Sequence, residues 1–529
     1  MTVTINNLIG GNPTNIGNKY FKVRSPFYNT FELNLADSSS IDISIALSKA
    51  KQSWDACQSL SLKERAEIIN TAATNLTFSE AELNSIVKMT GMPIKYISLQ
   101  INQIPTILTS FWQIISQRYG LKYGNIGLDF MENKSVHKIE FRISRNGFVY
   151  AVTPGNDPRI TAIVSTVLVL LGIPGIIKPS KIDTLIPIKI VKALLDSGYP
   201  KNGLSVIFFD PENPKTKEHH FKICDAASVI WPFGDENTVD NLLRLEKYNI
   251  FNLDNFLKEK EISGLKTEFP KFLKELEKSK NSLNNYLSEQ IIDHFSSKLI
   301  IRHASGRCAG IVDSNFDPKL AADLLIKSSM QYPIGCNSMK SVFVVEAIFD
   351  KLVENLNKKL VYLDEKTSDP LNLQTEVGYV DKKTVSFLES RTNELKRMKL
   401  ISILHGGKKL GPYQLTPLLI ATNDINSELL INEISGYILC IAKIKTFEEG
   451  VSIINKITMS NPKLAVSYFT NNPKNMRLYT NAHHIKINAP TTDLEGIVHE
   501  GNDYIMQLTR PHIIHINKKG LKEHPYREK

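Results

Sequence analysis

The sequence contains few cysteines and no long uninterrupted apolar segment, and both absences exclude classes of protein. Five cysteines are spread over 529 residues without a CxxC pair, so neither a disulfide framework nor a zinc site is expected. The most apolar segment, residues 160–174, is broken by glycine and proline and is shorter than the ~20 residues of a membrane span. The first residues lack the cationic and apolar regions of a signal peptide. We therefore expect a cytoplasmic protein without a membrane span or a metal.

No dense basic run is present either, although basic residues are in excess. The chain has 64 lysines and arginines against 54 aspartates and glutamates, for a formal net charge of +10. A surplus of this size suits an anionic partner. A nucleic-acid platform would cluster arginines with interleaved aromatic residues, and this pattern does not occur. The charge alone does not say whether the anion is a nucleic acid, a membrane or a phosphorylated small molecule, but because no motif supports nucleic acid, we expect no nucleic-acid partner.

What the sequence does contain is an alternation of short apolar strands with helices, once up to about residue 231 and again from about 299 to 490. Helices are expected at 41–58, from 61 onward, and at 79–90, 93–117, 157–171, 184–197, 350–358 and 447–457. Strands are expected at 134–144, 148–153, 175–178, 203–209, 227–231, 299–303, 341–345, 400–404, 437–444, 464–469 and 505–516, with a turn at 145–147. Continuous apolar strands joined by helices predict parallel sheets covered on both faces, with ligands beyond the carboxyl ends of the strands.

Residues 249–297 interrupt this alternation with a stretch rich in lysine and glutamate. Apolar residues recur in it at helical spacing. We interpret the stretch as a solvated amphipathic helical excursion rather than as a functional element.

Two features suggest chemistry before any family is considered. Cys336 follows a turn with proline and glycine and precedes an apolar strand, where a substrate could reach a thiol activated as a thiolate. A free cysteine is more often a small buried hydrophobic residue. Asn156 and Lys178 lie at the ends of neighbouring predicted strands, where their side chains could bind an oxyanion or a dinucleotide. An ordinary turn and a solvated lysine would give the same sequence pattern. The GxGxxG dinucleotide motif is absent.

Taken together, these segments resemble the aldehyde dehydrogenase superfamily. Six segments match family motifs in order, and the resemblance covers nearly the whole chain, from about residue 21 to 516. They are 153–158 (family TPWNFP), 177–185 (LKPSEQTPL), 198–207 (GLPPGVLNVV), 305–313 (GGKSPAIV), 405–408 (TGG) and 432–439 (EEIFGPVL), with Cys336 at the place of the nucleophile. The resemblance implies an α/β fold of two parallel-sheet domains, one for the cofactor and one catalytic, with an oligomerisation β-hairpin arm.

The same resemblance implies domain limits. The dinucleotide-binding domain would comprise residues 1–127 and 148–298, including the helical excursion, and the catalytic domain residues 299–490. Residues 128–147 and 491–529 would form the oligomerisation arm and tail. Because an exposed hairpin edge needs a partner strand, a homodimer or homotetramer is expected.

The resemblance also implies roles for individual residues. Cys336 would be the nucleophile, and the side-chain amide of Asn156 would form with the Cys336 N–H an oxyanion hole for the tetrahedral intermediate. Lys178 would contact the adenosine ribose and Glu433 the nicotinamide ribose. The other implied cofactor-binding residues are Thr153, Pro154, Ser180, Lys181 and Gly234. Members of this family hold the cofactor without a glycine-rich phosphate loop, in agreement with the missing GxGxxG.

Departures from the family motifs point to its CoA-acylating branch. Hydrolytic members place a water-activating glutamate in the segment ELGGK, and the aligned residue here is His303. A thioester on Cys336 would then lack the usual base for water but could be resolved by a thiol. The segments around Cys336 and from residue 510 to 519 also resemble acylating members. The implied reaction is the reduction of an acyl-CoA to an aldehyde through a cysteine thioester, with coenzyme A as co-substrate.

His303 leaves other interpretations open. It could be a substitute base, a structural residue, or a group that positions the thiolate or protonates the leaving group. A substitute base would make the protein a conventional aldehyde dehydrogenase, which oxidises an aldehyde to a carboxylate. A silent scaffold is a further possibility, and the joint presence of Asn156, Cys336 and Glu433 argues against it.

The cofactor and the acyl group are less sharply defined. Lys181 stands where NAD-preferring relatives often have a ribose-binding glutamate, and Lys178 and Lys181 together would attract a 2′-phosphate, so we predict NADP(H) over NAD(H). Gly234 lies in a segment that departs from the family's TGST turn, which leaves pyrophosphate contacts open. Malonyl, succinyl, short and long fatty acyl groups all remain possible. Three arginines are candidate partners for a substrate carboxylate: Arg159, Arg307 and Arg510.

Overall fold

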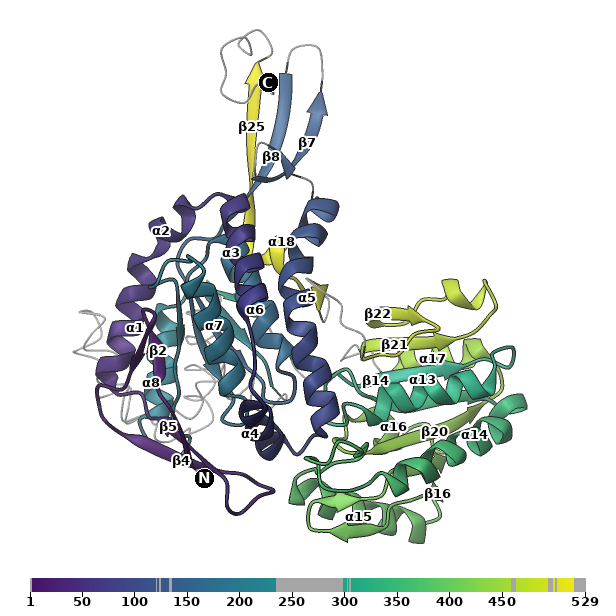
Figure 1. The fold of residues 1–529 in the computed structure, drawn as a ribbon. Helices are drawn as coiled ribbons and strands as arrows, with labels where there is room; N and C mark the ends of the chain where they lie inside the picture. The colour runs from purple at the N-terminus through teal and green to yellow at the C-terminus, as the bar shows by residue number, and fades with distance from the viewer. Residues whose placement is uncertain are drawn as a thin grey trace, which may run out of the picture.

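The computed structural model describes residues 2–119, 121–122, 125–132, 136–234, 298–301, 303, 306–457, 463–492, 498–499 and 502–517. The described strands form two seven-stranded sheets, a four-stranded sheet, a three-stranded sheet and two separate strand pairs. In Figure 1 the two large sheets lie in separate lobes with helices packed around them, and the four-stranded sheet projects from the first lobe. The predicted α/β class with parallel sheets is confirmed.

The first large sheet contains the apolar strands predicted between residues 148 and 231. Its order is β13-β12-β9-β10-β11-β2-β3, parallel from β13 to β11 and antiparallel at β2 and β3. The strands are β2 (Asn7–Ile9), β3 (Asn12–Thr14), β9 (Val149–Thr153), β10 (Gly175–Pro179), β11 (Leu204–Val206), β12 (Val229–Pro232) and β13 (Leu299–Ile300). The helices that cross between its strands are α6 (Arg159–Leu171), α7 (Leu185–Asp196) and α8 (Thr216–Ala226).

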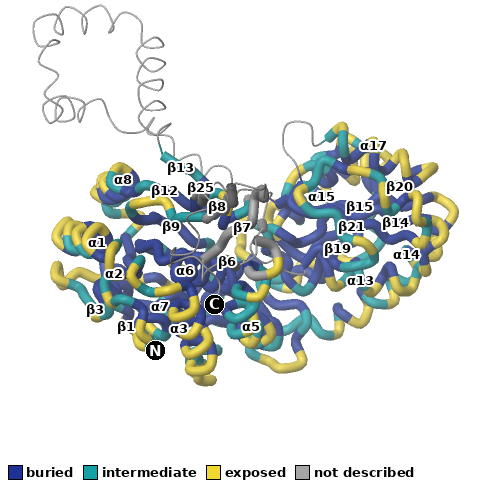
Figure 2. The backbone as a smooth tube through the Cα atoms, turned by 90° about the horizontal axis from the view of Figure 1, so that it is seen from above, coloured by how far each residue is buried: buried dark blue, intermediate teal, exposed yellow. Residues whose placement is uncertain are grey.

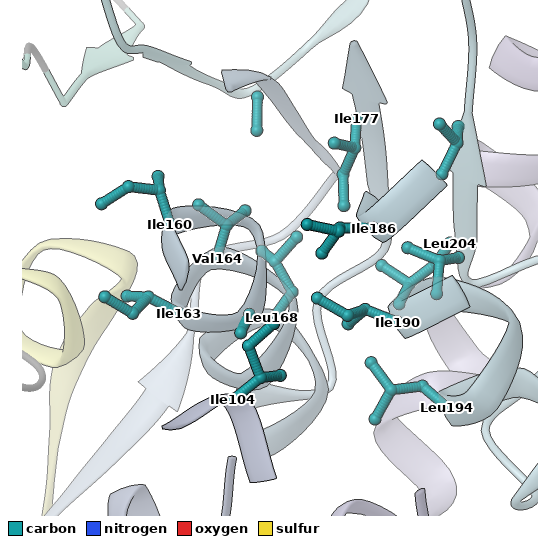
Figure 3. Close-up of a cluster of buried hydrophobic side chains, with 14 of the residues drawn as sticks. Ile104, Ile160, Ile163, Val164, Leu168, Ile177, Ile186, Ile190, Leu194 and Leu204 are labelled. Carbon is teal, nitrogen blue, oxygen red and sulfur yellow. The ribbon is translucent and has the colours of Figure 1, made fainter. Parts of the chain in front are cut away.

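Side chains of β9 alternate between two hydrophobic cores, because consecutive strand residues point to opposite faces. Val149 and Ala151 belong to the larger core with α6 and α7, while Tyr150 and Val152 belong to the smaller core with α1 and α8. Figure 3 shows the larger core, where Ile177 of β10 lies close to side chains of α6 and α7. All 13 residues of α6 are buried, which explains its uninterrupted apolar sequence.

The N-terminal helices begin where a serine is followed three residues later by an acid. Each serine side chain accepts the backbone N–H of that acid, and the acid accepts the serine N–H, so two unpaired donors are satisfied. The three pairs are Ser39 with Asp42, Ser61 with Glu64 and Ser79 with Glu82. The helices are α1 (Ser40–Gln52), α2 (Trp54–Ser59), α3 (Leu62–Asn75), α4 (Glu80–Thr90) and α5 (Ile94–Tyr119).

The second large sheet has the order β16-β19-β20-β15-β14-β21-β22, parallel except at the edge strand β16. Its strands are β14 (Cys308–Val312), β15 (Met339–Val345), β16 (Ile401–His405), β19 (Leu418–Thr422), β20 (Ile438–Ile444), β21 (Lys463–Phe469) and β22 (Ala482–Ile487). The surrounding helices are α13 (Pro318–Met330), α14 (Glu346–Glu365), α15 (Lys382–Arg397), α16 (Glu428–Ile431) and α17 (Phe447–Ile457). Figure 2 shows buried strands in both lobes and exposed positions on helices such as α1 and α14.

The four-stranded sheet joins distant parts of the chain in the order β25-β8-β7-β6. Its strands are β6 (Leu121–Lys122), β7 (Asn125–Glu132), β8 (Val136–Ser144) and β25 (Thr509–Asn517). β25 runs antiparallel to β8, from Thr509 opposite Ser144 to Asn517 opposite Val136. The helix α18 (Tyr504–Leu508) precedes β25 and packs into the larger core of the first sheet. Within the described ranges, no helix combines the length and apolar character that crossing a membrane requires.

Several local predictions are wrong. The helix expected at 41–58 is two helices, with Ser53 as the cap between α1 and α2. The strand expected at 299–303 as the start of the second α/β unit is β13, which instead pairs with β12 in the first large sheet. The tail expected as a strand from 505 begins as α18, because the Asp503 side chain caps the N–H of Met506.

Other elements were not predicted. They are the helices α8, α13, α15 and α16, the strands β2, β3, β6, β14, β19 and β22, the three-stranded sheet of β1 (Thr2–Ile5), β4 (Tyr20–Arg24) and β5 (Glu32–Ala36), and the pairs β17 (Lys409–Gly411) with β18 (Gln414–Leu415) and β23 (Val498–His499) with β24 (Asn502–Asp503). The predicted excursion at 249–297 lies outside the described residues.

Candidate active site

One cavity of about 680 Å³ lies where loops at the carboxyl ends of the first sheet meet the loop that carries Cys336. Every site residue predicted from the sequence lines it: Cys336, Asn156, His303, Thr153, Pro154, Lys178, Ser180, Lys181, Gly234 and Glu433. These residues come from segments almost 300 positions apart at the extremes, yet the parallel arrangement of the strands delivers them to one place. Their assembly makes the cavity the candidate active site.

The turn after β9 forms one wall of the cavity and also reaches the second lobe. Gly155 packs so tightly on the loop after β10 that a Cβ there would lie 2.3 Å from Ile182 Cγ1. The Asn156 side-chain nitrogen donates a hydrogen bond of 2.8 Å to the carbonyl oxygen of Ile334, two residues before Cys336. The amide predicted to act with Cys336 is therefore bonded directly to the loop that holds this cysteine.

The loop from Tyr332 to Ser338, which we call the nucleophile loop, presents Cys336 to the cavity. Two tight turns shape it, since Gly335 N–H donates to Tyr332 O at 3.0 Å and Ser338 N–H to Gly335 O at 2.9 Å. The Thr491 hydroxyl donates to Asn337 O at 2.7 Å and fastens its far side. Cys336 is half-buried, whereas the other four cysteines are buried. It is thus the cysteine that a substrate or an alkylating reagent can reach.

Gly306 fixes the depth of the nucleophile loop. A Cβ at this position would lie 1.7 Å from the carbonyl oxygen of Cys336, so the two backbones touch. The Gly306 N–H donates to Glu433 Oε2 at 2.7 Å. The family resemblance implied a ribose-binding role for Glu433. The hydrogen bond from the Gly306 N–H was not predicted from any motif. The glutamate, Gly306 and Cys336 therefore form a continuous chain of contacts.

His303 is buried, with 1% of its surface exposed, among aromatic side chains. Its ring stacks on Phe233 with centroids 4.3 Å apart and an interplanar angle of 4°. Its Nε2 lies 3.1 Å from the hydroxyl of Tyr504 in α18. Burial lowers the pKa of His303 to about 3, and the nearby His483 lowers it further. The imidazole is therefore neutral at physiological pH and is a weak base.

Two lysines, one near the end of β10 and one just after it, belong to the cavity lining. Lys178 is half-buried and Lys181 exposed, and both line the cavity. Burial lowers the pKa of Lys178 to about 8, and the positive charge of Lys181 acts in the same direction. Two like charges held this close favour an anion between or beside them.

The structure adds lining residues that sequence reasoning missed. Phe209 follows β11, and Thr216 and His220 belong to α8, a helix that was not predicted. The His220 Nδ1 lies 2.6 Å from the hydroxyl of Tyr150, and the ring meets Phe209 edge-on at 4.9 Å. Burial lowers the pKa of His220 to about 3. Phe209 and His220 therefore contribute aromatic rings to the cavity lining, with His220 near Lys178.

The predicted carboxylate partners do not reach the cavity. The buried guanidinium of Arg159 binds the Asp157 carboxylate at 2.8 and 2.7 Å and the Gln103 side-chain oxygen at 2.9 Å. Arg510 lies in β25 of the four-stranded sheet, opposite Ile143. Neither of them, nor Arg307, belongs to the cavity lining.

A two-lobed α/β fold with a reachable thiol, a side-chain amide and a lysine pair around one cavity defines an oxidoreductase of the aldehyde dehydrogenase type. The chain belongs to the aldehyde dehydrogenase family: the model of the "Aldehyde dehydrogenase family" matches residues 14–220 and 288–501. The unmatched segment between them overlaps the lysine- and glutamate-rich stretch.

The chain is also similar to known proteins at low identity. It is 30% identical over 167 residues to aldehyde dehydrogenase family 2 member C4 of Arabidopsis thaliana, covering 30% of this chain and 32% of that protein. It is 26% identical over 167 residues to gamma-glutamyl phosphate reductase of Psychrobacter cryohalolentis, covering 28% and 38%. These matches span about a third of each relative. The fold is similar to that of an NAD-dependent aldehyde dehydrogenase from Sinorhizobium meliloti, with a TM-score of 0.77, 17% identity, and coverage of 98% and 95%.

Proposed function

We propose that the protein is an NADPH-dependent acyl-CoA reductase that converts an acyl-CoA to an aldehyde through a thioester on Cys336. The observation that carries this proposal is the absence, among the described residues lining the cavity, of a carboxylate available to activate water. The acids in that lining are Asp157, which binds Arg159, and Glu433, which accepts the N–H of Gly306. His303, at the place of the hydrolytic glutamate, has its pKa lowered to about 3, which makes it a poor general base near neutrality.

The chemistry needs a nucleophile, an oxyanion hole and a leaving group. The Cys336 thiolate would attack the thioester carbonyl carbon, the bond to the CoA sulfur would break, and CoA would leave as a thiolate. One Asn156 amide hydrogen is donated to Ile334, and the second would stabilise the oxyanion together with the Cys336 N–H. NADPH, when bound, supplies the hydride that converts the enzyme thioester to an aldehyde and releases the Cys336 thiolate.

The lysine pair supports NADPH as the cofactor. Lys178 and Lys181 both line the cavity, and the pKa of Lys178 is lowered to about 8 by burial and, in second place, by the positive charge of Lys181. A 2′-phosphate would offset this repulsion and the hydroxyl of NADH would not. Thr153, Pro154, Ser180 and Gly234 line the same cavity and would contact the rest of the cofactor.

Relatives support both the proposal and its alternative. Gamma-glutamyl phosphate reductase is, by its name, a reductase of an activated acyl group. The Sinorhizobium meliloti structure is, by its name, an aldehyde dehydrogenase, which favours the conventional oxidation of an aldehyde to a carboxylate as the second candidate. The two candidates differ in whether coenzyme A is required.

A panel of acyl-CoAs tests the proposal. Purified protein is incubated with NADPH and with malonyl-, succinyl-, short-chain or long-chain acyl-CoA, and loss of NADPH absorbance and release of free CoA thiol are followed together. We expect one class to give equal amounts of NADP⁺ and aldehyde, and Cys336→Ser to give none. Oxidation of aldehydes with NADP⁺ or NAD⁺ in the absence of CoA would instead establish the conventional reaction.

We further propose that the first large sheet forms the cofactor domain and the second the catalytic domain, with assembly through the four-stranded sheet. Among the described strands, β25 pairs only with β8, so its other edge can accept a strand from a second copy. Light scattering coupled to gel filtration should give a dimer or tetramer. Pro substitution at residues of this edge should shift the mass toward the monomer.

A further inference from the structure

Lys340 is a buried lysine four residues after Cys336, and the proposed chemistry does not use it. It lies in β15 with 3% of its surface exposed. Its Nζ donates a hydrogen bond of 2.6 Å to the carbonyl oxygen of Gly436, and the carbonyl oxygen of Ser329 lies 3.5 Å away. Lysine is almost never buried unless its ammonium is paired. We therefore consider which segments the contacts of the Lys340 ammonium join.

The main partner of Lys340 belongs to a segment of the candidate active site. Residues 433–436 carry Glu433 and Ser435, which both line the cavity. Gly436 at the end of this segment also donates its N–H to Pro333 O at 3.0 Å, in the nucleophile loop. Gly436 is therefore held by two hydrogen bonds: its N–H donates to the nucleophile loop, and its carbonyl oxygen accepts from Lys340 in β15. Loss of the ammonium would leave the Gly436 carbonyl with the N–H of Ile438, at 2.9 Å, as its described partner.

The second neighbour links Lys340 to the opposite side of the nucleophile loop. Ser329 lies at the end of α13, and its carbonyl oxygen also accepts the Ser338 hydroxyl at 3.3 Å. The lysine therefore lies between the end of a helix, the nucleophile loop and segment 433–436. A side chain at such a junction can set the relative position of the three parts.

We propose that Lys340 is a positioning residue that holds segment 433–436 against the nucleophile loop, so that Glu433 and Cys336 face the same cavity. The inference rests on the proposed function in one respect, the assignment of Glu433 to the nicotinamide ribose of NADPH. Because hydrogen bonds from a charged donor are roughly twice as strong as neutral ones, the ammonium holds the segment more firmly than the amine.

The protonation of Lys340 makes this effect depend on pH. Burial lowers the pKa of Lys340 to about 7, and the negative charge of Glu433 acts in the opposite direction; Cys308 is the other ionisable neighbour, and burial raises the pKa of its thiol to about 12, so it is neutral in this range. These two are the ionisable groups that act on it in the described part of the chain. The charged form is present below pH ~7 and is lost as the pH rises through this value.

The test compares NADPH binding by the wild-type protein and by Lys340→Met, measured by fluorescence titration on both sides of neutrality. Methionine is similar in length and apolar, so it suits the buried site. We expect Lys340→Met to bind NADPH about tenfold more weakly below pH 7, the loss typical of a charged hydrogen bond. Above pH 7 the ratio of the two dissociation constants should fall towards one. Taking the ratio cancels the titration of Lys178, which both proteins share.

Two further variants complete the design. Lys443→Met removes a positive charge from an exposed position of β20 in the same sheet, and we expect it to bind NADPH like the wild type at every pH. If Lys340→Met does not fold, Lys340→Gln replaces it, since glutamine keeps a donor without the charge. Thermal denaturation reports which variants are folded.

The outcomes separate this inference from the proposed function. Equal NADPH affinity of wild type and Lys340→Met, or a ratio that does not change with pH, would overturn the positioning role. Because the measurement uses NADPH alone, a protein that binds NADPH but reduces no acyl-CoA would refute the proposed function and leave the Lys340 comparison valid.

Discussion

Gly306→Ala is the sharpest test of whether the depth of the nucleophile loop determines the reactivity of Cys336. The added Cβ would lie 1.7 Å from the Cys336 carbonyl oxygen and 2.5 Å from its carbonyl carbon. Carbon and oxygen atoms in close non-bonded contact stay about 3.3 Å apart, so one backbone must retreat by more than ~1 Å. Neither atom belongs to a flexible side chain that could simply turn away. A displacement of ~1 Å at reacting groups costs on the order of 100-fold in rate.

We therefore expect kcat for acyl-CoA reduction to fall about 100-fold, and alkylation of Cys336 by iodoacetamide to slow as well. The matched control is Gly411→Ala in β17, where no described atom lies within 4 Å of the added Cβ. This control should keep wild-type activity, and circular dichroism should show both variants folded. A folded Gly306→Ala protein with kcat within about twofold of wild type would refute the reasoning, because the nucleophile loop would then tolerate the shift.

Three further predictions concern the cofactor, acid stability and the second sheet. Lys181→Glu should lower kcat/KM for NADPH about tenfold or more and leave kcat/KM for NADH nearly unchanged, as shown by initial rates with both cofactors. His303→Phe should make the protein less sensitive to acid. In the folded protein the His303 imidazole stays neutral down to its pKa of about 3, whereas in the unfolded chain it binds a proton below pH ~6.5. Between these two values the wild type therefore loses ~1.4 kcal/mol of unfolding free energy per pH unit because of this group. Urea denaturation at several acidic pH values should show that the unfolding free energy of the variant falls less steeply with decreasing pH, by that amount. Thr470→Val should cost about 1–3 kcal/mol in the same assay, because its buried hydroxyl donates to Asp313 Oδ2 at 2.6 Å.

The large sheets could be predicted from the sequence because their strands are buried on both faces. β9, β10 and β12 contain continuous apolar residues, and α6 is apolar all round since every residue of it is buried. Where an element is completely buried, its continuous apolar sequence is sufficient to predict it. The short strands β1 and β4 could not be predicted in this way, because their residues alternate between buried and exposed environments over only a few positions.

The candidate site could be predicted for a related reason. Asn156, Lys178 and Gly234 lie at or just beyond the carboxyl ends of strands of one parallel sheet, so they reach the same edge once the strand order is set. Cys336 stood out because a turn with proline and glycine precedes it and an apolar strand follows it, and family motifs supplied Glu433. The sequence thus identified these residues of the site, but not Phe209, Thr216 and His220 in its lining.

Partners of these residues could not be predicted, since they depend on contacts between distant segments. The hydrogen bond from Gly306 to Glu433 and the approach of His303 to Tyr504 join positions 127 and 201 residues apart. Arg159 was expected to be available to a substrate carboxylate, but Asp157, two residues earlier, already holds its guanidinium. Such pairings depend on how the segments pack, which spacing alone does not reveal.

The position of α18 and β25 has a consequence for how the protein is made. Tyr504, Ile505 and Leu508 fill the larger core of the first sheet, whose last strand, β13, ends at Ile300. At a synthesis rate of about 10 residues per second, the first lobe waits roughly 20 seconds after β13 is made before α18 leaves the ribosome. The second lobe is synthesised during this time, while the first still exposes apolar surface. We expect the nascent first lobe to be the part of the chain that chaperones bind.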